Sequence, residues 1–234
     1  LDFSDDQKFL QEEARKSLEK EKSISRNRSV LETESHADQE LWNKIVDLGW
    51  TGIRIPEDYG GLGLGHLELC VIAEELGRYL APVPFSSSVY LFTEAIINYG
   101  NEEIKKDLLP KLVTGEVIGT LAVTEELYAP SKSNIKVSSK NNALNGKKIA
   151  VPDAEIATHS LVVSKSDKGV SLQLVDLSSP GVTIKHQENI DESRGHFSIE
   201  FDGVKSDLVG DENSGWELYE TLINQAAVLF SYEQ

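Results

Sequence analysis

Apolar side chains in the first half of the chain recur with the spacing of α-helices. Each set below follows i, i+3 or i+4 steps, which places an apolar stripe on one face of a helix. The sets are Leu10, Ala14 and Leu18; Leu41, Ile45 and Leu48; Leu69, Ile72, Leu76 and Leu80; Val89, Phe92, Ile96 and Tyr99; and Ile104, Leu108 and Leu112. The pattern predicts an N-terminal α-helical bundle over residues 1–115.

Residues that begin and end helices fit this pattern. Ser4 precedes two acidic residues and Gln7, which predicts a helix N-cap. Gly49, Gly77 and Gly100 stand where three of the helices are expected to end. The helical half therefore has local signals for its boundaries as well as for its buried faces.

The hydrophobic period changes to two near residue 116. Alternation is clearest over residues 117–124, 170–174 and 197–201, and it predicts β-strands. Asn145-Gly146, Ser179-Pro180-Gly181 and Asp202-Gly203 are turn signals, and the first of them predicts a hairpin. The prediction is a middle antiparallel β-barrel-like domain over residues 116–210. Residues 211–234 return to a helical period and read as a linker and the start of a C-terminal helical domain, which gives an α+β multidomain fold.

The amino-acid composition argues against several kinds of partner and binding site. With 23 Lys and Arg against 39 Asp and Glu, the formal net charge is −16, so no nucleic-acid partner is expected. Cys70 is the only cysteine, which excludes an internal disulfide and fits a cytoplasmic location. The apolar runs are too short for a membrane span. The five histidines show no metal-binding spacing, so no metal site is expected.

Two local patterns invite a functional interpretation. The glycine-rich stretch over residues 58–65 lacks the Gly-Lys-Ser/Thr ending of a phosphate loop and joins two predicted helices, so a tight structural turn is favoured. Glu125-Glu126 follows a strand and opens an irregular loop, which is a common place for a ligand. The residues alone leave both a solvated charge pair and a site open there.

Six short motifs occur in the order typical of the acyl-CoA dehydrogenase family, and the chain resembles that family over nearly its whole length. The motifs are Ile55-Pro56-Glu57-Asp58-Tyr59-Gly60-Gly61-Leu62-Gly63, Ala73-Glu74-Glu75-Leu76-Gly77-Arg78, Leu121-Ala122-Val123-Thr124-Glu125, Asn145-Gly146-Lys147-Lys148, the pair Ser179-Pro180-Gly181-Val182 and Phe201-Asp202-Gly203-Val204, and Gly210-Asp211-Glu212-Asn213-Ser214-Gly215-Trp216. Each motif alone is weak evidence for the family, but six motifs in the same order are specific evidence for it.

The resemblance implies a flavoprotein with three domains. Flavin adenine dinucleotide (FAD) would lie between the β domain and a C-terminal bundle, a carboxylate would remove the α proton of an acyl-CoA thioester, and the β hydrogen would leave as hydride to the flavin. A homo- or hetero-tetramer is implied, with electron-transfer flavoprotein as a potential electron acceptor. The resemblance assigns flavin contact to Leu121, Val123, Thr124, Ala150, Val151 and Pro152.

The chain departs from the family pattern at several of these positions. The loop after Thr124-Glu125 lacks the family's Gly-Ser-Asp. Ala150 stands at the aromatic position, and Pro152 stands at the hydroxyl position and has no N–H to donate. Ala226 occupies the place where some members carry the general base, and neither Glu220 nor Glu233 matches that place. No catalytic residue is assigned.

Three interpretations follow from the resemblance. The chain is part of a flavin-dependent acyl-CoA dehydrogenase subunit, with a fatty-acid or steroid side-chain thioester as substrate. Alternatively, it is a non-catalytic partner in a hetero-oligomer with a degenerate flavin site, as in family members from bacteria that act on steroid side chains through two unlike subunits. The third interpretation is another flavin reaction on the same fold, such as that of an oxidase or a monooxygenase.

Overall fold

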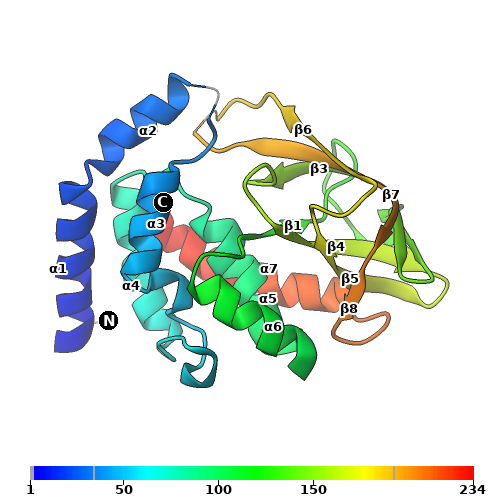
Figure 1. Cartoon of the computed structure of the whole chain (residues 1–234), viewed down its shortest axis with the longest axis horizontal. Helices are drawn as coiled ribbons and strands as arrows, with labels where there is room; N and C mark the ends of the chain where they lie inside the picture. Colours follow the sequence, from blue (N-terminus) through cyan, green and yellow to red (C-terminus); the bar gives the residue numbers. More distant parts are fainter. Residues whose placement is uncertain (1–2, 34, 192) are drawn as a thin grey trace.

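The computed structural model describes residues 3–33, 35–191 and 193–234, with helices on one side of the molecule and a β-sheet on the other (Figure 1). The helical side is built by residues up to Val113, and the strands follow from Gly119 onward. The helices of these described residues are α1 (Asp5–Lys20), α2 (Ser23–Leu31), α3 (Gln39–Asp47), α4 (His66–Arg78), the π-helix η3 (Ser86–Thr93), α5 (Glu94–Tyr99), α6 (Glu102–Val113) and α7 (Gly215–Glu233), with short 3₁₀ turns η1 (Trp50–Gly52), η2 (Glu57–Tyr59) and η4 (Lys132–Asn134).

Local signals account for most helix boundaries. Ser4 forms the predicted N-cap of α1, and its side chain accepts a hydrogen bond from the Gln7 N–H at 3.2 Å. Gly49 follows α3 in the left-handed conformation, with φ +75°, as expected for a helix end. Gly77 does not end a helix, because α4 continues to Arg78. Gly77 instead allows α4 and α7 to cross closely, because a Cβ at this position would lie 1.7 Å from the carbonyl oxygen of Glu233 in α7.

Eight strands form one sheet with the order β6-β7-β3-β2-β4-β5-β8, and β1 pairs with β4 off this path. The strands are β1 (Gly119–Ala122), β2 (Ser138–Lys140), β3 (Ala143–Pro152), β4 (His159–Ser166), β5 (Gly169–Asp176), β6 (Val182–Gln187), β7 (His196–Lys205) and β8 (Asp207–Val209). Most pairings are antiparallel, as predicted, but β1 and β2 each pair with β4 in parallel, so the sheet is mixed.

Two predicted turns lie inside strands. Asn145-Gly146 belongs to β3, and the hairpin between β2 and β3 turns instead at Asn141 and Asn142, whose φ values are +53° and +59°. Consecutive positive φ angles are what a two-residue type I′ hairpin turn requires, and asparagine tolerates them. Asp202-Gly203 lies inside β7, beside a register shift against β3. These two predicted turns are therefore parts of a strand irregularity, whereas Ser179-Pro180-Gly181 lies in the turn between β5 and β6, as predicted.

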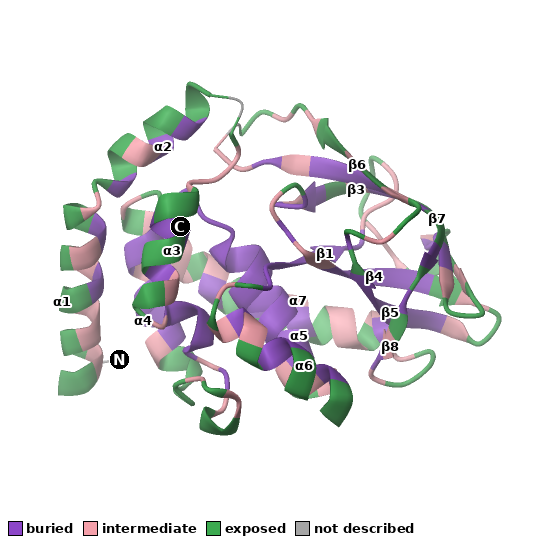
Figure 2. Ribbon diagram, viewed as in Figure 1, coloured by how far each residue is buried: buried purple, intermediate pink, exposed green. Residues whose placement is uncertain are grey.

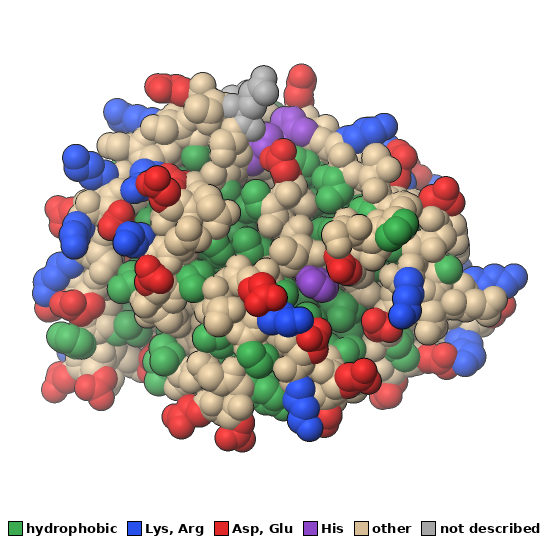
Figure 3. Space-filling model, viewed as in Figure 1, with side chains coloured by type: hydrophobic (Ala, Val, Ile, Leu, Met, Phe, Trp, Pro, Cys, Tyr) green, Lys and Arg blue, Asp and Glu red, His purple; other side chains and the backbone are tan. Residues whose placement is uncertain are grey.

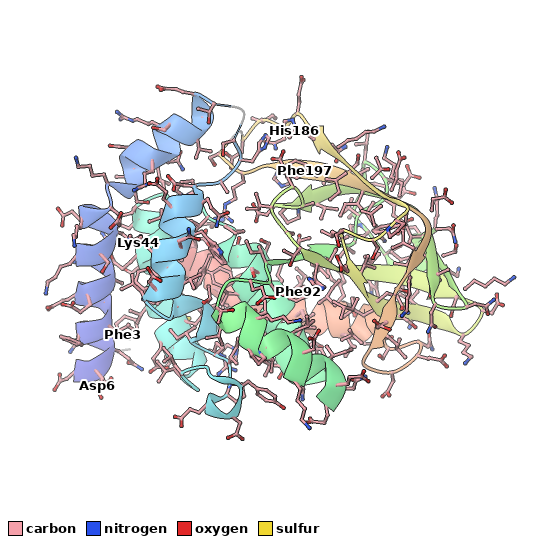
Figure 4. The ribbon with its side chains drawn as sticks, in the orientation of Figure 1. Phe3, Asp6, Lys44, Phe92, His186 and Phe197 are labelled. Atoms are coloured by element: carbon pink, nitrogen blue, oxygen red, sulfur yellow. The ribbon has the colours of Figure 1, made fainter. Side chains whose placement is uncertain are left out.

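One hydrophobic cluster joins the helices to β4, β5 and α7, and a second lies among the β-strands. Figure 2 shows η3 and the neighbouring strand β1 largely buried, whereas α1 exposes most of its surface. Phe92 of η3, labelled in Figure 4, packs so closely on β1 that a Cβ at Gly119 would meet its ring atoms at 2.0 Å. The first strand is thus fixed directly against the buried π-helix, and α7 packs on both α4 and β5.

Candidate functional site

The six residues predicted to contact flavin come together where β1 and the chain after it run beside β3. The Ile149 N–H donates to the Thr124 carbonyl at 2.8 Å. The Thr120 hydroxyl donates to the Pro152 carbonyl at 2.6 Å. These two bonds connect segments about 25 to 30 residues apart in the sequence. The two bonds hold these segments side by side. We call this region the β1–β3 wall and define it by Thr124, Ala150 and Pro152.

Only half of the predicted residues present their side chains on this wall. Ala150 is exposed, and Thr124 and Pro152 are half-buried. The other three side chains contribute to the two hydrophobic cores; they are Leu121, Val123 and Val151. If these three have a role in binding a ligand, it is to support the wall from behind.

The backbone of the wall is locally distorted. The pairing of β3 with β7 shifts register between Lys148 and Val151, which marks a β-bulge. Within it Ala150 has φ +50°, and its N–H donates to the side-chain oxygen of Gln187 at 2.8 Å. A positive φ is uncommon for a residue with a Cβ, and such strain is concentrated at functional sites. The distortion turns the short Ala150 side chain towards solvent.

Replacing Ala150 with glycine tests this strain. Glycine adopts positive φ without the clash of a Cβ, and its larger entropy in the unfolded chain offsets part of the gain. We expect Ala150→Gly to raise the free energy of unfolding by about 0.5–1 kcal/mol, measured by urea denaturation. Ala227→Gly, on the exposed face of α7, is the control and should lower it by about 1 kcal/mol. Destabilisation of both variants would contradict the assignment of strain to Ala150.

A buried ion pair lies directly beneath the wall. The Lys148 Nζ donates to the Glu125 Oε1 at 2.7 Å and to the Val123 carbonyl at 2.9 Å. The Lys148 side chain is 0% exposed and that of Glu125 is 6% exposed. Glu125 also accepts from the N–H groups of Lys136 at 2.7 Å and Val137 at 3.0 Å. Glu125 therefore fixes the loop that leaves the wall, and its role in this structure is to stabilise the wall.

Burial lowers the pKa of Lys148 to about 8, although the hydrogen bond to Glu125 opposes the shift. The densest basic run of the sequence, Lys147-Lys148, is thus divided by strand alternation. Lys147 lies on the surface and pairs with Glu200 at 3.0 Å, while Lys148 points inward.

Two further departures from the family pattern lie outside the wall, in the loop after Glu125 and on α7. The loop that replaces Gly-Ser-Asp exposes Leu127 completely and Tyr128 in large part. On α7, Ala226 is fully buried, so the position that carries the base in some relatives has no titratable group here. Glu233, farther along α7, is ion-paired with Arg194. Glu220, in contrast, is exposed.

Sequence reasoning did not identify Asp153, which is buried next to the end of the wall, or Arg194, which is half-buried close to it. Asp153 follows Pro152 directly and is 3% exposed. A carboxylate immediately after the end of a strand is the one sequence signal that could have singled it out. Arg194 gives no comparable signal, because its loop has no clear hydrophobic period.

Other candidate chemistry is limited. Within the described residues no three His, Cys, Asp or Glu side chains are arranged to hold a metal ion. His36 bonds Glu155 at 2.8 Å and stacks on His186 of β6, which is labelled with Phe197 in Figure 4. Acidic side chains are spread over the face drawn in Figure 3 and do not gather in one patch. Among the helices that the structure describes, none combines the length and apolarity needed to cross a bilayer.

Known proteins resemble this chain along most of its length. Residues 4–116 match the family "Acyl-CoA dehydrogenase, N-terminal domain". Isovaleryl-CoA dehydrogenase from Pongo abelii is 30% identical over 195 residues, covering 76% of this chain and 46% of the relative. The chain thus spans about half the length of this relative.

Solved structures agree with that similarity. A variant of Tcur3481-Tcur3483 steroid ACAD superposes with a TM-score of 0.84 at 29% identity, covering 97% of this chain and 62% of that one. Butyryl-CoA dehydrogenase from Megasphaera elsdenii superposes with a TM-score of 0.89 at 22% identity, covering 100% of this chain and 66% of that one, which shows a shared fold. Residues 4–116 thus match the acyl-CoA dehydrogenase family, and the chain as a whole resembles acyl-CoA dehydrogenases in sequence and in fold.

Proposed function

We propose that the chain is the helical and β portion of a flavin-dependent acyl-CoA dehydrogenase subunit, with FAD bound against the β1–β3 wall. One observation carries the proposal: hydrogen bonds from Ile149 to Thr124 and from Thr120 to Pro152 hold two segments of the chain side by side, although these segments are distant in the sequence. The family supplies the reaction class. The substrate proposed is an acyl-CoA thioester, and a tetramer and electron-transfer flavoprotein are proposed partners.

The wall fits one face of a flavin ring. Thr124 offers a half-exposed hydroxyl that can donate or accept a hydrogen bond. Ala150 and Pro152 offer small apolar surfaces against which a planar ring can lie, but no aromatic cover and, at Pro152, no N–H. Bound flavin would supply hydride acceptance. This chain's own residues would bind and orient the ring, and Lys148 and Glu125 would hold the wall behind it.

Titration of the purified protein with FAD tests the proposal. Binding is followed by the quenching of flavin fluorescence. We expect Thr124→Val to weaken binding roughly five-fold, since a lost hydroxyl hydrogen bond contributes about 1 kcal/mol. Thr221→Val, on the exposed face of α7, is the matched control and should leave the affinity unchanged. Absence of flavin binding by the unaltered protein would contradict the proposal for this chain.

A second function, that of a non-catalytic partner in a hetero-oligomer, is favoured by a specific observation on α7. Ala226 is buried and cannot accept a proton, and Glu233 is compensated by Arg194. A subunit with this helix would bind flavin weakly or only together with a sister subunit that carries the base. The similarity to Tcur3481-Tcur3483 steroid ACAD supports this alternative, and with it a steroid side-chain thioester in place of a fatty-acyl one.

Anaerobic reduction separates the two functions. Loss of the flavin's visible absorbance when an acyl-CoA is added to the isolated protein would support the catalytic function. Bleaching that requires a co-expressed sister subunit would support the partner function. Parallel additions of a straight-chain and a steroid side-chain acyl-CoA distinguish the two substrate classes.

A further inference from the structure

A cluster of buried and half-buried polar side chains lies where the helices, the β-strands and α7 meet. Ser86 and Ser87 begin the π-helix η3, Asp153 follows β3, Arg194 precedes β7, and Glu233 ends α7. These five residues come from four separate segments, and we call them the Arg194 cluster. Long π-helices are rare and often mark functional sites, and all eight residues of η3 are buried.

Hydrogen bonds join the members of the cluster into two groups, which we call arms: Ser87 with Asp153, and Ser86 with Arg194 and Glu233. The Ser87 hydroxyl donates to Asp153 Oδ2 at 2.5 Å. Arg194 donates through Nη1 to the Ser86 hydroxyl and through Nη2 to Glu233 Oε1. Ser86 and Ser87 are adjacent in η3, and each belongs to one of the two arms.

The charges of the cluster depend on one another. Burial raises the pKa of Asp153, while Ser87 and Arg194 oppose that shift. Burial acts to lower the pKa of Arg194, but Glu233 and Asp153 outweigh it and the pKa is raised. The side chain of Arg194 is 32% exposed and that of Glu233 is 15% exposed, so solvent screens this ion pair in part. Asp153 is buried and depends on its partners, because an uncompensated buried charge is costly. Removing one partner is therefore expected to disturb the others.

The cluster is connected to the β1–β3 wall through the backbone. Asp153 directly follows Pro152 and has φ +56°, and Ala150 within the wall has φ +50°. The Asp153 N–H donates to the carbonyl of Gly195, the residue after Arg194, at 3.0 Å. A non-glycine residue persists in this conformation only when its surroundings fix it. The Asp153 side chain is held by Ser87 of the cluster, and its N–H is held by Gly195 next to Arg194, so the shape of the wall's end depends on both.

We propose that the Arg194 cluster is a positioning network that couples the position of α7 to the shape of the flavin-facing wall. This proposal rests on the proposed function. Glu233 links the cluster to α7, and Asp153 links the cluster to the end of the wall. None of the cluster residues belongs to the wall as defined. They act on it through Asp153 and the backbone of β3.

Hydrogen exchange in flavin-free protein tests the coupling independently of cofactor binding. The N–H groups of Ile156 and Ala157 donate to the Asp153 carbonyl and report on the turn at the end of the wall. In Glu233→Gln, which keeps the side chain's size and removes its charge, we expect exchange at these amides to accelerate about ten-fold or more. Glu220→Gln, on the exposed face of α7, is the matched control and should leave the rates unchanged. Acceleration confined to the last turn of α7 would overturn the proposal.

A second variant and a second measurement complete the test. Arg194→Lys keeps the positive charge but loses the planar fork that spans Ser86 and Glu233, so it should accelerate the same amides even if Glu233→Gln fails to fold. In FAD titrations, both cluster variants should bind about ten-fold more weakly than Glu220→Gln. Equal FAD affinity in all variants would overturn the coupling to the wall. Absence of FAD binding in every protein, with accelerated exchange retained, would reject the proposed function and support the network.

Discussion

Substitution of Lys148 by methionine is expected to lower the free energy of unfolding by about 3–5 kcal/mol, the usual cost of leaving one partner of a buried ion pair alone. Methionine fills a similar volume but donates no hydrogen bond. The Glu125 carboxylate would keep its two backbone donors and lose its ion pair with Lys148. The Val123 carbonyl would lose its bond to Lys148 as well. Urea denaturation monitored by tryptophan fluorescence measures the loss.

The double variant Lys148→Met/Glu125→Gln is the control for this result. Neutralising Glu125 removes the uncompensated charge, so the double variant should recover a large part of the lost stability. If it is no more stable than Lys148→Met, the ion pair does not account for the effect.

The pH dependence of stability gives a second readout for Lys148. Its pKa is about 8 in the folded protein and 10.5 for an unperturbed lysine. Between these values the unfolded chain binds more protons than the folded one, so this group's contribution to stability increases as pH rises. The difference in stability between the unaltered protein and Lys148→Met should therefore widen from pH 8 upward. A difference that narrows over this range would contradict the lowered pKa.

Gly77→Ala is expected to destabilise the protein by about 2 kcal/mol, although alanine is the better helix former by about 1 kcal/mol. The added Cβ would lie 1.7 Å from the Glu233 carbonyl oxygen, so α4 and α7 must separate. Because a backbone atom is in the way, a change of rotamer cannot relieve the clash. Stability is measured by urea denaturation, and separation of the helices by faster exchange of the Gln234 amide, which donates to the Phe230 carbonyl.

Gly60→Ala is the comparison for this prediction. A Cβ at Gly60 meets nothing within 4 Å, but its φ of +84° makes the change cost about 1 kcal/mol through backbone strain alone. It should not alter exchange at Gln234. If Gly77→Ala instead stabilises the protein, helix propensity outweighs the crossing and α7 is packed more loosely than the structure indicates.

The periodicity of the sequence identified helices with a broad buried face and strands with clear alternation. It did not predict α2 (Ser23–Leu31), which buries few of its residues and so carries little apolar pattern. It placed the hairpin at Asn145-Gly146, because that dipeptide is the stronger local signal. Pairing with β7 in the tertiary structure holds Asn145 and Gly146 inside a strand, and the adjacent asparagines at 141 and 142 form the turn.

The segments that carry the candidate residues Thr124, Ala150 and Pro152 are hydrogen-bonded side by side in the structure. Leu121, Val123 and Val151 face the cores, which strand alternation decides once neighbouring layers are in place. Whether any of the six contacts flavin remains a prediction. The Lys148–Glu125 pair joins residues 23 apart, and no local pattern could indicate that their charges meet.

The sequence by itself determined the local conformations, the acidic charge and the resemblance to a family, since each of these depends on residue type and short-range spacing. Only the tertiary structure decided which charges are buried together, where β3 bulges, and that Arg194 connects η3 with the end of α7. The physical reason is that a buried charge or a positive φ is tolerated only when partners from distant segments compensate for it. Such partners become neighbours only when the chain folds.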